Sequence, residues 1–379
     1  MIKSIKFWIA MTALFLILIY FASSNKFISC FKYEFTDKSS LTLNLTLINP
    51  QIHAIACDPA NKLVLKIRVL NSSDIPVPMA HVGLSVDSGK GNIYPKDVRT
   101  DNNGEALVTY IPPIFSSTLS TKENSFVNIT SNIKGTQVKS NLKLELKRTP
   151  VILIHGYQAS SLSFKDMMDF LDAKGFETSA IDYESENGVA AGSKTLNNFI
   201  EDRKLYYLSK GLQVEKFDLV AHSMGGLVAR YYTCSRQYLQ NNDVRKIIFI
   251  SVPQNGSPLA SIGEAYFSDL GIADLVPENK LYSTIFPGMI NKGLNSTIQI
   301  GSICGQYDEV VSHESASLEE WKIQTEFLAI GKNNFNVDNL LNGDITKASN
   351  HMSILINKKV FEKIYIMLSS ELPYPAILR

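Results

Sequence analysis

The sequence predicts a chain in two parts, an all-β sandwich followed by an α/β unit with a mostly parallel sheet. Two observations predict this. Up to about residue 147, apolar residues alternate with polar ones in short runs, and no helix-length pattern interrupts them. From residue 151 onward, short runs that are apolar throughout alternate with helix-length segments, as expected when helices cover both faces of a sheet.

The length and charge of the chain fit this division. At 379 residues the chain exceeds the roughly 250 to 300 residues at which a single core stops growing, so two domains are expected. The 37 basic residues nearly cancel the 36 acidic ones for a net charge of +1. A nucleic-acid partner would require a basic face or run, and we therefore expect none.

The N-terminus predicts export. Lys3 and Lys6 precede the uncharged and mostly apolar run from Phe7 to Ala22, which a short polar stretch closes. We expect residues 1–26 to be a signal peptide or an N-terminal membrane anchor, because the run lies between a signal h-region and the roughly 18 to 20 residues of a spanning helix. A third option is lipidation at Cys30, where the preceding residues loosely resemble a lipobox. The protein is thus expected to be secreted or anchored at the cell surface.

The cysteines and histidines show no spacing typical of a metal site. The four cysteines are too few for a disulfide scaffold, although Cys30 and Cys57 are candidates for one bridge at the start of the first domain. The sequence contains no C-x-x-C, and none of its six histidines forms an H-x-x-x-H or H-E-x-x-H pair. We expect neither a metal nor another cofactor.

Residues 41–147 are predicted to form an immunoglobulin-like sandwich. About seven short strands, separated by turn residues, have the count and spacing typical of that fold. The clearest runs are 41–47, 63–69, 82–86, 107–110, 126–129 and 142–146. The stretches Asp74-Ile75-Pro76-Val77-Pro78 and Thr100-Asp101-Asn102-Asn103-Gly104-Glu105-Ala106 resemble bacterial Ig-like modules of the invasin type. The resemblance implies a spacer, with an adhesive unit as the alternative.

Residues 151–379 are predicted to form a doubly wound α/β domain. The expected strands are 151–154, 179–182, 217–221, 247–252, 298–303 and 327–330. The expected helices are 162–173, 196–208, 224–239 and 352–368. Ligands bind such sheets at the carboxyl ends of the strands, so the functional residues are expected in the loops that follow them.

The run Phe217 to Gly226 has the pattern of a strand, a sharp turn and the start of a helix. It fits the nucleophile elbow G-x-S-x-G, except that Ala221 replaces the first glycine. Such a turn lifts a serine hydroxyl clear of the sheet, and the helix N-terminus favours negative charge beside it. Ser223 is therefore the candidate nucleophile, although a serine helix cap would also fit the bare pattern.

The strand from Val151 to Ile154 ends in His155-Gly156, the expected place for an oxyanion site. Acyl transfer passes through a tetrahedral oxyanion, which preorganised backbone N–H donors stabilise. The expected donors are the backbone N–H groups of Tyr157, after His155-Gly156, and of Met224, directly after the nucleophile. His155 and His222 are expected to be structural members of these motifs.

The acid and the base are expected downstream, in the order serine, acid, histidine. Asp308 lies in the loop after the strand at 298–303 and is the candidate acid, with Glu309 as the alternative. Two histidines follow. His313 is too close to Asp308 in the same loop, whereas His351 precedes the last amphipathic helix and is the candidate base.

Residues 151–369 resemble the α/β-hydrolase lipases and esterases. The run Ala221-His222-Ser223-Met224-Gly225-Gly226 is similar to that of small secreted bacterial lipases, and Ser251 to Ser257 resembles the family's Thr-Pro-x-x-Gly-Ser turn with Val in place of Thr. The resemblance implies that the serine is acylated by an ester, that histidine and aspartate activate it, and that water releases the acid.

The segment from Leu259 to Asn295 bears on the substrate. Its apolar residues predict either a lid over the acyl site or ordinary helices that pack on the sheet. We expect a serine hydrolase that cleaves carboxylic esters, with a lipid or other ester as substrate, a lipase as the first interpretation and a lipid surface as a candidate partner. The alternatives are an esterase, deacylase or acyltransferase acting on non-lipid esters, and a binding protein that uses the hydrolase fold as a scaffold.

Overall fold

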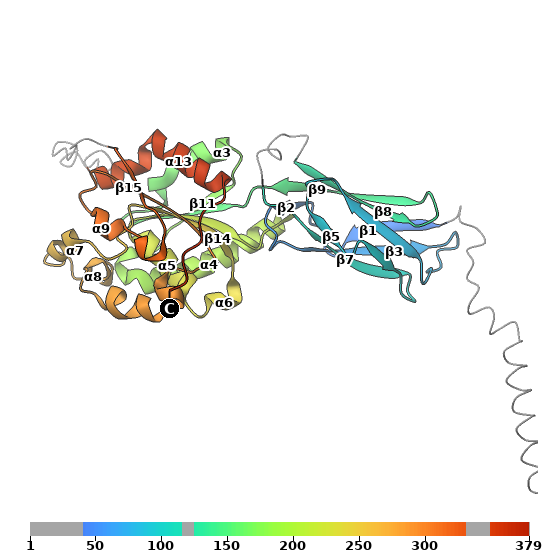
Figure 1. Ribbon diagram of the computed structural model, residues 1–379, viewed down its shortest axis with the longest axis horizontal. Helices are drawn as coiled ribbons and strands as arrows, with labels where there is room; N and C mark the ends of the chain where they lie inside the picture. The colour runs from blue at the N-terminus through green and yellow to red at the C-terminus, as the bar shows by residue number, and fades with distance from the viewer. Residues whose placement is uncertain (1–40, 116–124, 331–348, 379) are drawn as a thin grey trace, which may run out of the picture.

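The computed structural model describes residues 41–115, 125–330 and 349–378. Within them, the chain forms an all-β part and an α/β part that lie end to end (Figure 1). The predicted signal or anchor at residues 1–26 and the cysteine at position 30 lie outside the described residues. Cys57 is buried with a free thiol, as are Cys234 and Cys304. No helix in the described ranges is both long enough and apolar enough to cross a membrane.

The all-β part is built from two sheets that face each other. One sheet has the order β1-β3-β7-β5, and the other has the order β12-β2-β9-β8-β4-β6. Apolar side chains from both sheets meet in a single core cluster, because alternate residues of a strand point to opposite faces. The strands are β1 (Thr42–Leu47), β2 (Ala54–Ala56), β3 (Leu63–Leu70), β4 (His81–Val86), β5 (Asn92–Tyr94), β6 (Asp97–Arg99), β7 (Glu105–Ile111), β8 (Phe126–Ile133) and β9 (Lys139–Lys147).

One strand of the second sheet comes from the α/β part. The strand β12 (Leu212–Gln213) pairs in parallel with β2, with Leu212 opposite Ala54. Asn61 is fully buried beside this junction, where its Nδ2 donates to the Ala56 carbonyl at 2.8 Å and its Oδ1 accepts the Glu215 N–H at 2.6 Å. The two predicted units therefore share a sheet, which the sequence did not indicate, and their boundaries as independent domains stay a prediction.

The α/β part contains a six-stranded sheet in the order β11-β10-β13-β14-β15-β16. All of its neighbouring strands pair in parallel. Its central strands are buried along their whole length, which explains why the sequence reads as continuous apolar runs there. The strands are β10 (Val151–Ile154), β11 (Thr178–Ile181), β13 (Phe217–His222), β14 (Val244–Ile250), β15 (Gln299–Gly305) and β16 (Glu326–Leu328).

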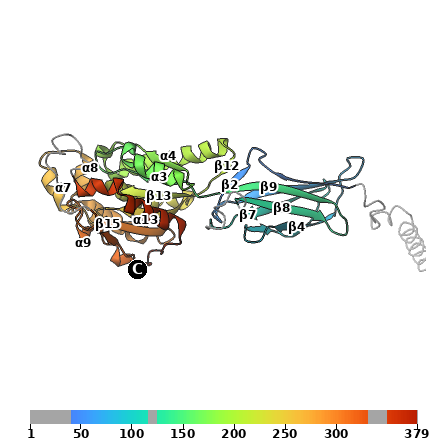
Figure 2. The same ribbon diagram turned by 90° about the horizontal axis from the view of Figure 1, so that it is seen from above.

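Helices cover both faces of this sheet (Figures 1 and 2). Val151 and Leu153 of β10 pack with helices α3 and α13, whereas Ile152 and Ile154 pack with α4 and α5. The principal helices are α3 (Lys165–Ala173), α4 (Gly188–Ser209), α5 (Met224–Cys234), α6 (Tyr238–Asn241), α7 (Pro258–Gly263), α8 (Leu270–Leu275), α9 (His313–Ala316), α12 (Asn350–Ser353) and α13 (Lys358–Ser369). Shorter helical turns lie at η3 (Ser161–Phe164), η4 (Ser185–Asn187), η5 (Leu281–Ile285), η6 (Phe286–Gly288), η7 (Ile290–Gly293), η8 (Glu319–Trp321) and η9 (Ile354–Ile356).

Two predicted helices are divided. The helix predicted over 224–239 ends at Cys234 and resumes as α6, and the one predicted over 352–368 is split into α12, η9 and α13. In the second case, Asn357 stops the chain in an extended conformation and its side chain caps α13 by accepting the Lys359 N–H. The division leaves α12 as a separate short turn that carries His351.

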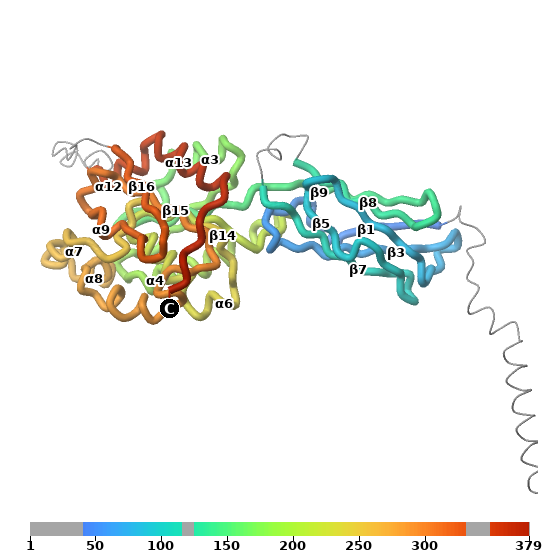
Figure 3. The backbone as a smooth tube through the Cα atoms, in the orientation of Figure 1, coloured from blue at the N-terminus to red at the C-terminus, as the bar shows by residue number. Residues whose placement is uncertain are grey.

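The carboxyl ends of the parallel strands face away from the all-β part. The labels α7, α8, α9 and α12 gather at the end of the molecule farthest from the sandwich in Figure 3. The segments that follow β10, β13 and β15 belong to this same end, where ligands of open α/β sheets bind. The described chain begins at the opposite end of the sandwich (Figures 1 and 2).

Candidate active site

Ser223 occupies the sharp turn between β13 and α5. Its backbone has φ 52° and ψ −129°, a conformation that non-glycine residues rarely adopt and that costs about 1–3 kcal/mol. The surrounding fold holds this turn, because Ser223 donates its N–H to the Ile250 carbonyl at 3.0 Å. The strained turn places the hydroxyl at the carboxyl edge of the sheet, as the sequence predicts.

Small residues around Ser223 allow helix α5 to approach the sheet closely. A Cβ atom added to Gly225 would lie less than 3.0 Å from the backbone of Ile154 and His155, and one on Gly226 would collide with Val252. At the first motif position, Ala221 replaces the usual glycine, and it is fully buried in the core formed with α4 and α5.

Three predicted residues lie in one hydrogen-bonded chain. His351 Nε2 lies 2.9 Å from Ser223 Oγ, and its Nδ1 lies 2.9 Å and 3.1 Å from the two carboxylate oxygens of Asp308. Oδ1 of Asp308 also accepts the backbone N–H groups of Val310 and Val311. A serine, an imidazole and a buried carboxylate in this order can pass a proton from the hydroxyl to the ring.

Charge pairing favours the ionised carboxylate and the protonated ring. Burial works against the charge of Asp308, but the neighbouring His351 and hydrogen bonds outweigh it and lower the pKa of the carboxyl to about 2. Burial likewise opposes charging of His351, yet the Asp308 carboxylate dominates and holds its pKa above the ordinary value of 6.5. The pair is thus suited to accept a proton at Nε2.

Glu309 binds the backbone that carries His351 rather than its ring. Its carboxylate accepts the N–H of Asn350 at 3.1 Å and that of His351 at 3.4 Å, as well as the hydroxyl of Ser349. These contacts place an acidic group at the start of α12. Of the two neighbouring acidic residues, Asp308 therefore contacts the imidazole and Glu309 fixes the turn.

His313 lies outside this chain of residues. It opens α9, its ring packs against Phe327 with 4.0 Å between centroids, and its Nε2 lies 3.3 Å from the Gln306 carbonyl. His313 is exposed. This position agrees with the expectation that His313, close to Asp308 in sequence, is not the base.

The two expected oxyanion donors border Ser223. Met224 is the first residue of α5, so its N–H belongs to the first turn, whose donors have no acceptor within the helix. Tyr157 follows Gly156, whose Cα packs so closely that an added Cβ would lie 2.8 Å from Ser223 Cβ. The Tyr157 hydroxyl donates to Asp269 Oδ2 at 2.6 Å, which ties this loop to helix α8.

An apolar cavity of about 260 Å³ opens beside Ser223. The segment predicted as a lid or as packing helices supplies one wall of it, from α7 and α8: Leu259, Ala260, Gly263, Ile272 and Leu275. Ile272 and Leu275 are also buried in the core beneath, whereas Ile262, Tyr266 and Leu270 of the same segment are exposed. The segment therefore packs on the sheet and covers the cavity at once.

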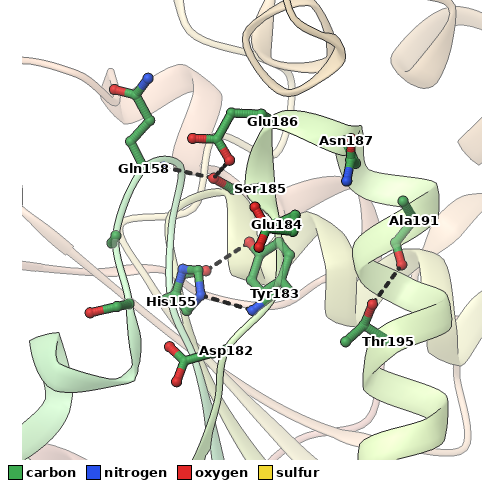
Figure 4. A pocket seen from close by; sticks show the side chains of 12 residues that line it. His155, Gln158, Asp182, Tyr183, Glu184, Ser185, Glu186, Asn187, Ala191 and Thr195 are labelled. Carbon is green, nitrogen blue, oxygen red and sulfur yellow. Dashed lines mark hydrogen bonds between the residues drawn. The ribbon is translucent and has the colours of Figure 1, made fainter.

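A second, polar pocket of about 670 Å³ lies beside the loop that follows β10 and carries Tyr157. Figure 4 shows His155 and Tyr183 at its base, where the Tyr183 hydroxyl donates to the His155 carbonyl at 2.8 Å and His155 Nε2 accepts the Tyr183 N–H at 3.3 Å. The rings of the two residues stack at 4.4 Å. His155 thus supports the loop that carries Tyr157, as predicted for a structural member of the motif.

Sequence reasoning missed two polar residues that organise the site. Glu309 was considered only as a rival acid, and its role as a clamp on α12 depends on contacts more than forty residues apart in the chain. Asp269 was not singled out. Its one local signal is the N-cap pattern, since Oδ1 accepts the Ile272 N–H three residues on, but this pattern does not reveal the bond to Tyr157.

Comparison with known proteins supports the fold. Residues 149–275 match the family model described as the alpha/beta hydrolase fold. The chain is also similar to the propeptide form of the Bacillus licheniformis lipase BlEst2, with 15% identity and a TM-score of 0.46 over 61% of this chain and 52% of that chain. A similarity to Aspergillus fumigatus lipase B has 15% identity and a TM-score of 0.43 over 60% and 54% of the two chains.

A further similarity among solved structures covers a smaller share of the chain. The D00-D0 domain of intimin is similar over 29% of this chain and 48% of that one, with 12% identity and a TM-score of 0.24. The chain spans about half the length of each of these three proteins. The predicted α/β-hydrolase fold with a preceding all-β sandwich is confirmed, and the resemblance of that sandwich to invasin-type modules stays a prediction.

Proposed function

We propose that this protein hydrolyses carboxylic esters through an acyl-enzyme intermediate on Ser223. The observation that supports it most is the continuous contact from Ser223 Oγ through His351 to Asp308. In this mechanism His351 takes the hydroxyl proton as Ser223 Oγ attacks the ester carbonyl, and the backbone N–H groups of Tyr157 and Met224 stabilise the oxyanion. His351 then protonates the leaving alcohol, and a water activated by His351 releases the acid.

The acyl group is proposed to lie in the apolar cavity, which makes a lipid ester the first candidate substrate. Leu259, Ile272 and Leu275 line this cavity next to Ser223. Each methylene buried there contributes about 0.8 kcal/mol, so longer acyl chains gain binding energy until the cavity is filled. The exposed apolar side chains of Ile262, Tyr266 and Leu270, in the segment that supplies one wall of the cavity, support contact with a lipid surface.

The test is hydrolysis of a p-nitrophenyl ester series from acetate upward by the wild type, Ser223→Ala and His351→Ala. Loss of either residue is expected to lower kcat by about 10⁴-fold or more. In the wild type, kcat/KM is expected to rise by about fourfold for each added methylene over the first few. Unchanged hydrolysis by Ser223→Ala would refute Ser223 as the nucleophile, whereas a wild type that hydrolyses none of these esters would favour a scaffold that binds without chemistry.

Introducing a charge into the cavity wall tests whether the protein is a lipase or an esterase that acts on water-soluble esters. Leu259→Asp is expected to lower kcat/KM for long-chain esters much more than for acetate, because a long acyl chain buries more apolar surface against the wall that the charge disrupts. Leu162→Asp is the matched control, since Leu162 is 77% exposed and lies outside the cavity lining. A flat chain-length profile in both variants would favour the non-lipid alternative. Product analysis with added alcohols distinguishes an acyltransferase.

Export and surface anchoring stay proposals drawn from residues 1–26. The arrangement of the described chain supports them, because its first residues and the proposed active site lie at opposite ends (Figure 1). A chain held at its N-terminus would thus present Ser223 outward, with the sandwich as a spacer. Cell fractionation of the tagged full-length chain tests this, and recovery in the cytoplasm would contradict it.

A further inference from the structure

His222, the last residue of β13, contacts the backbone of the proposed base. Its side chain is 1% exposed, and its Nε2 lies 3.0 Å from the carbonyl oxygen of His351. Because a carbonyl oxygen only accepts hydrogen bonds, the proton of the His222 ring is on Nε2. The two imidazole rings also pack together, with 4.6 Å between centroids.

The other ring nitrogen of His222, Nδ1, is buried without a hydrogen-bond partner among the described residues, and in this tautomer it is a bare acceptor. Burial, together with the neighbouring His351, lowers the pKa of His222 to about 3, so the ring stays neutral near pH 7. An unpaired buried acceptor costs about 1–3 kcal/mol, which a residue chosen only for packing would avoid.

The segment that carries His351 is held from several sides. Asp308 binds the ring at Nδ1, and Glu309 binds the backbone N–H. The bond from His222 to the backbone carbonyl is the contact from the strand that carries the nucleophile. Since His222 and Ser223 are consecutive, this bond links the position of the His351 ring directly to the position of Ser223 Oγ.

We propose that His222 is a positioning residue, whose Nε2–H holds the carbonyl of His351 and keeps the imidazole of His351 aligned with Ser223 Oγ. This inference rests on the proposed function, since alignment matters only if His351 is the base. The unsatisfied Nδ1 is then the cost of keeping a donor at this point. A small misplacement of a catalytic group lowers turnover steeply.

Two amide substitutions separate the two ring nitrogens. Glutamine at position 222 places an N–H near the former Nε2, so His222→Gln keeps the bond, whereas the shorter side chain in His222→Asn places its amide near Nδ1 and loses the bond. With p-nitrophenyl butyrate, His222→Asn is expected to lower kcat by about tenfold or more with KM within about twofold. His222→Gln is expected to stay within about threefold of the wild-type kcat.

Thermal unfolding and a second background exclude a merely structural role. The Tm of both variants is measured, and kcat is compared at a temperature well below either Tm, so that a difference in kcat between them is not a difference in folding. In a His351→Ala background, His222→Asn is expected to leave the residual rate unchanged, because no imidazole is left at position 351 for His222 to align. A further loss in that background, or equal kcat for the two amide variants, would overturn the inference.

The proposed function fails by a different result. If the wild type neither hydrolyses the ester nor reacts with a fluorophosphonate, hydrolysis by Ser223 is refuted and the role of His222 falls with it. If the wild type is active and Ser223→Ala is not, the function stands, and the comparison of His222→Asn with His222→Gln decides the positioning role alone.

Discussion

At the level of single residues, the pairing of His351 with Asp308 sets the pH at which Ser223 can react. The base must be neutral to accept a proton, and the carboxylate holds the pKa of His351 above 6.5. The pKa of Asp308 is about 2, so this group stays ionised over the working range. The acid limb of kcat/KM therefore reports the free-enzyme titration of His351.

We expect kcat/KM to decrease as the pH is lowered through the apparent pKa of His351, which lies above 6.5. In Asp308→Asn the carboxylate is lost while burial of the ring remains, so the pKa of His351 drops and the acid limb moves to lower pH, with a much lower plateau. Initial-rate profiles from pH 4 to 9 for the two proteins measure this. An acid limb at the same pH in both would contradict the assignment of Asp308 as the partner of His351.

Gly225 is expected to be intolerant of a side chain. An added Cβ would run into the backbone of β10, which cannot move without disturbing the sheet, so Gly225→Ala should lower the free energy of unfolding by about 3 kcal/mol. Gly288→Ala is the matched control, because a Cβ there meets no atom within 4 Å. Urea unfolding measures both, and equal stability would show that the approach of α5 to β10 is looser than described.

A functional residue can be predicted from the sequence when its neighbours in the chain form a recognisable pattern. Ser223 carries a motif of neighbouring residues, and Asp308 and His351 follow from chain order and from their positions in loops. Glu309 and Asp269 act on groups far away in sequence, so no local pattern distinguishes them from other acidic loop residues. His222 was predicted as structural, and its bond to His351 depends on the fold of residue 351.

At the level of elements, the loop after β10 and helix α8 are coupled. Asp269 caps α8 with one oxygen and accepts the Tyr157 hydroxyl with the other. Gly271 makes the contact tighter, since a Cβ there would lie 2.9 Å from Tyr157 Cε2. The segment that walls the cavity is thus fixed to the loop proposed to supply an oxyanion donor.

Tyr157→Phe tests this coupling, because it keeps the backbone N–H and removes only the hydroxyl. We expect kcat to fall by about tenfold, as the loop loses a hydrogen bond to a charged group. Tyr282→Phe is the control: it removes a hydroxyl that donates to the Asp274 carbonyl within the same segment but away from the loop. Equal kcat for the wild type and Tyr157→Phe would show that the loop holds its position without Asp269.

The parallel strands of the α/β part were predicted, and the short strands of the sandwich were not. The central parallel strands read as apolar runs because helices cover both faces. The strands β2, β5 and β6 have three residues each, which is too short for alternation to be visible. Helix α4 begins at Gly188, eight residues before its expected start, because its first turns are rich in small residues that carry little apolar signal.

At the level of the whole molecule, the junction makes the sandwich more than a tethered spacer. The strand β12 extends a sheet of the sandwich, and Ala54 and Ala56 of β2 belong to the core cluster of the α/β part. A flexible linker would show neither shared pairing nor a shared core. Residues 148–150 mark the change from alternating to continuous apolar runs, and nothing in their composition indicates that the two parts share a sheet and a core.

We expect calorimetry of the chain to show one cooperative unfolding transition. Asn61→Ala removes both junction hydrogen bonds from a fully buried site, which is expected to cost about 2 kcal/mol and to lower that single transition. Asn102→Ala, in an exposed turn of the sandwich, is the control and is expected to be neutral. Two resolved transitions, with only one shifted by Asn61→Ala, would mean that the parts unfold independently.

The most direct test of the account is the location of a covalent adduct. A fluorophosphonate phosphonylates a serine, with loss of fluoride, only where a base and an oxyanion site activate it, so peptide mapping of the labelled wild type is expected to place one adduct on Ser223. Ser223→Ala, verified as folded by its Tm, is expected to take up no label, and His351→Ala to react far more slowly. Labelling at another residue, or of Ser223→Ala at the wild-type rate, would contradict Ser223 as the nucleophile.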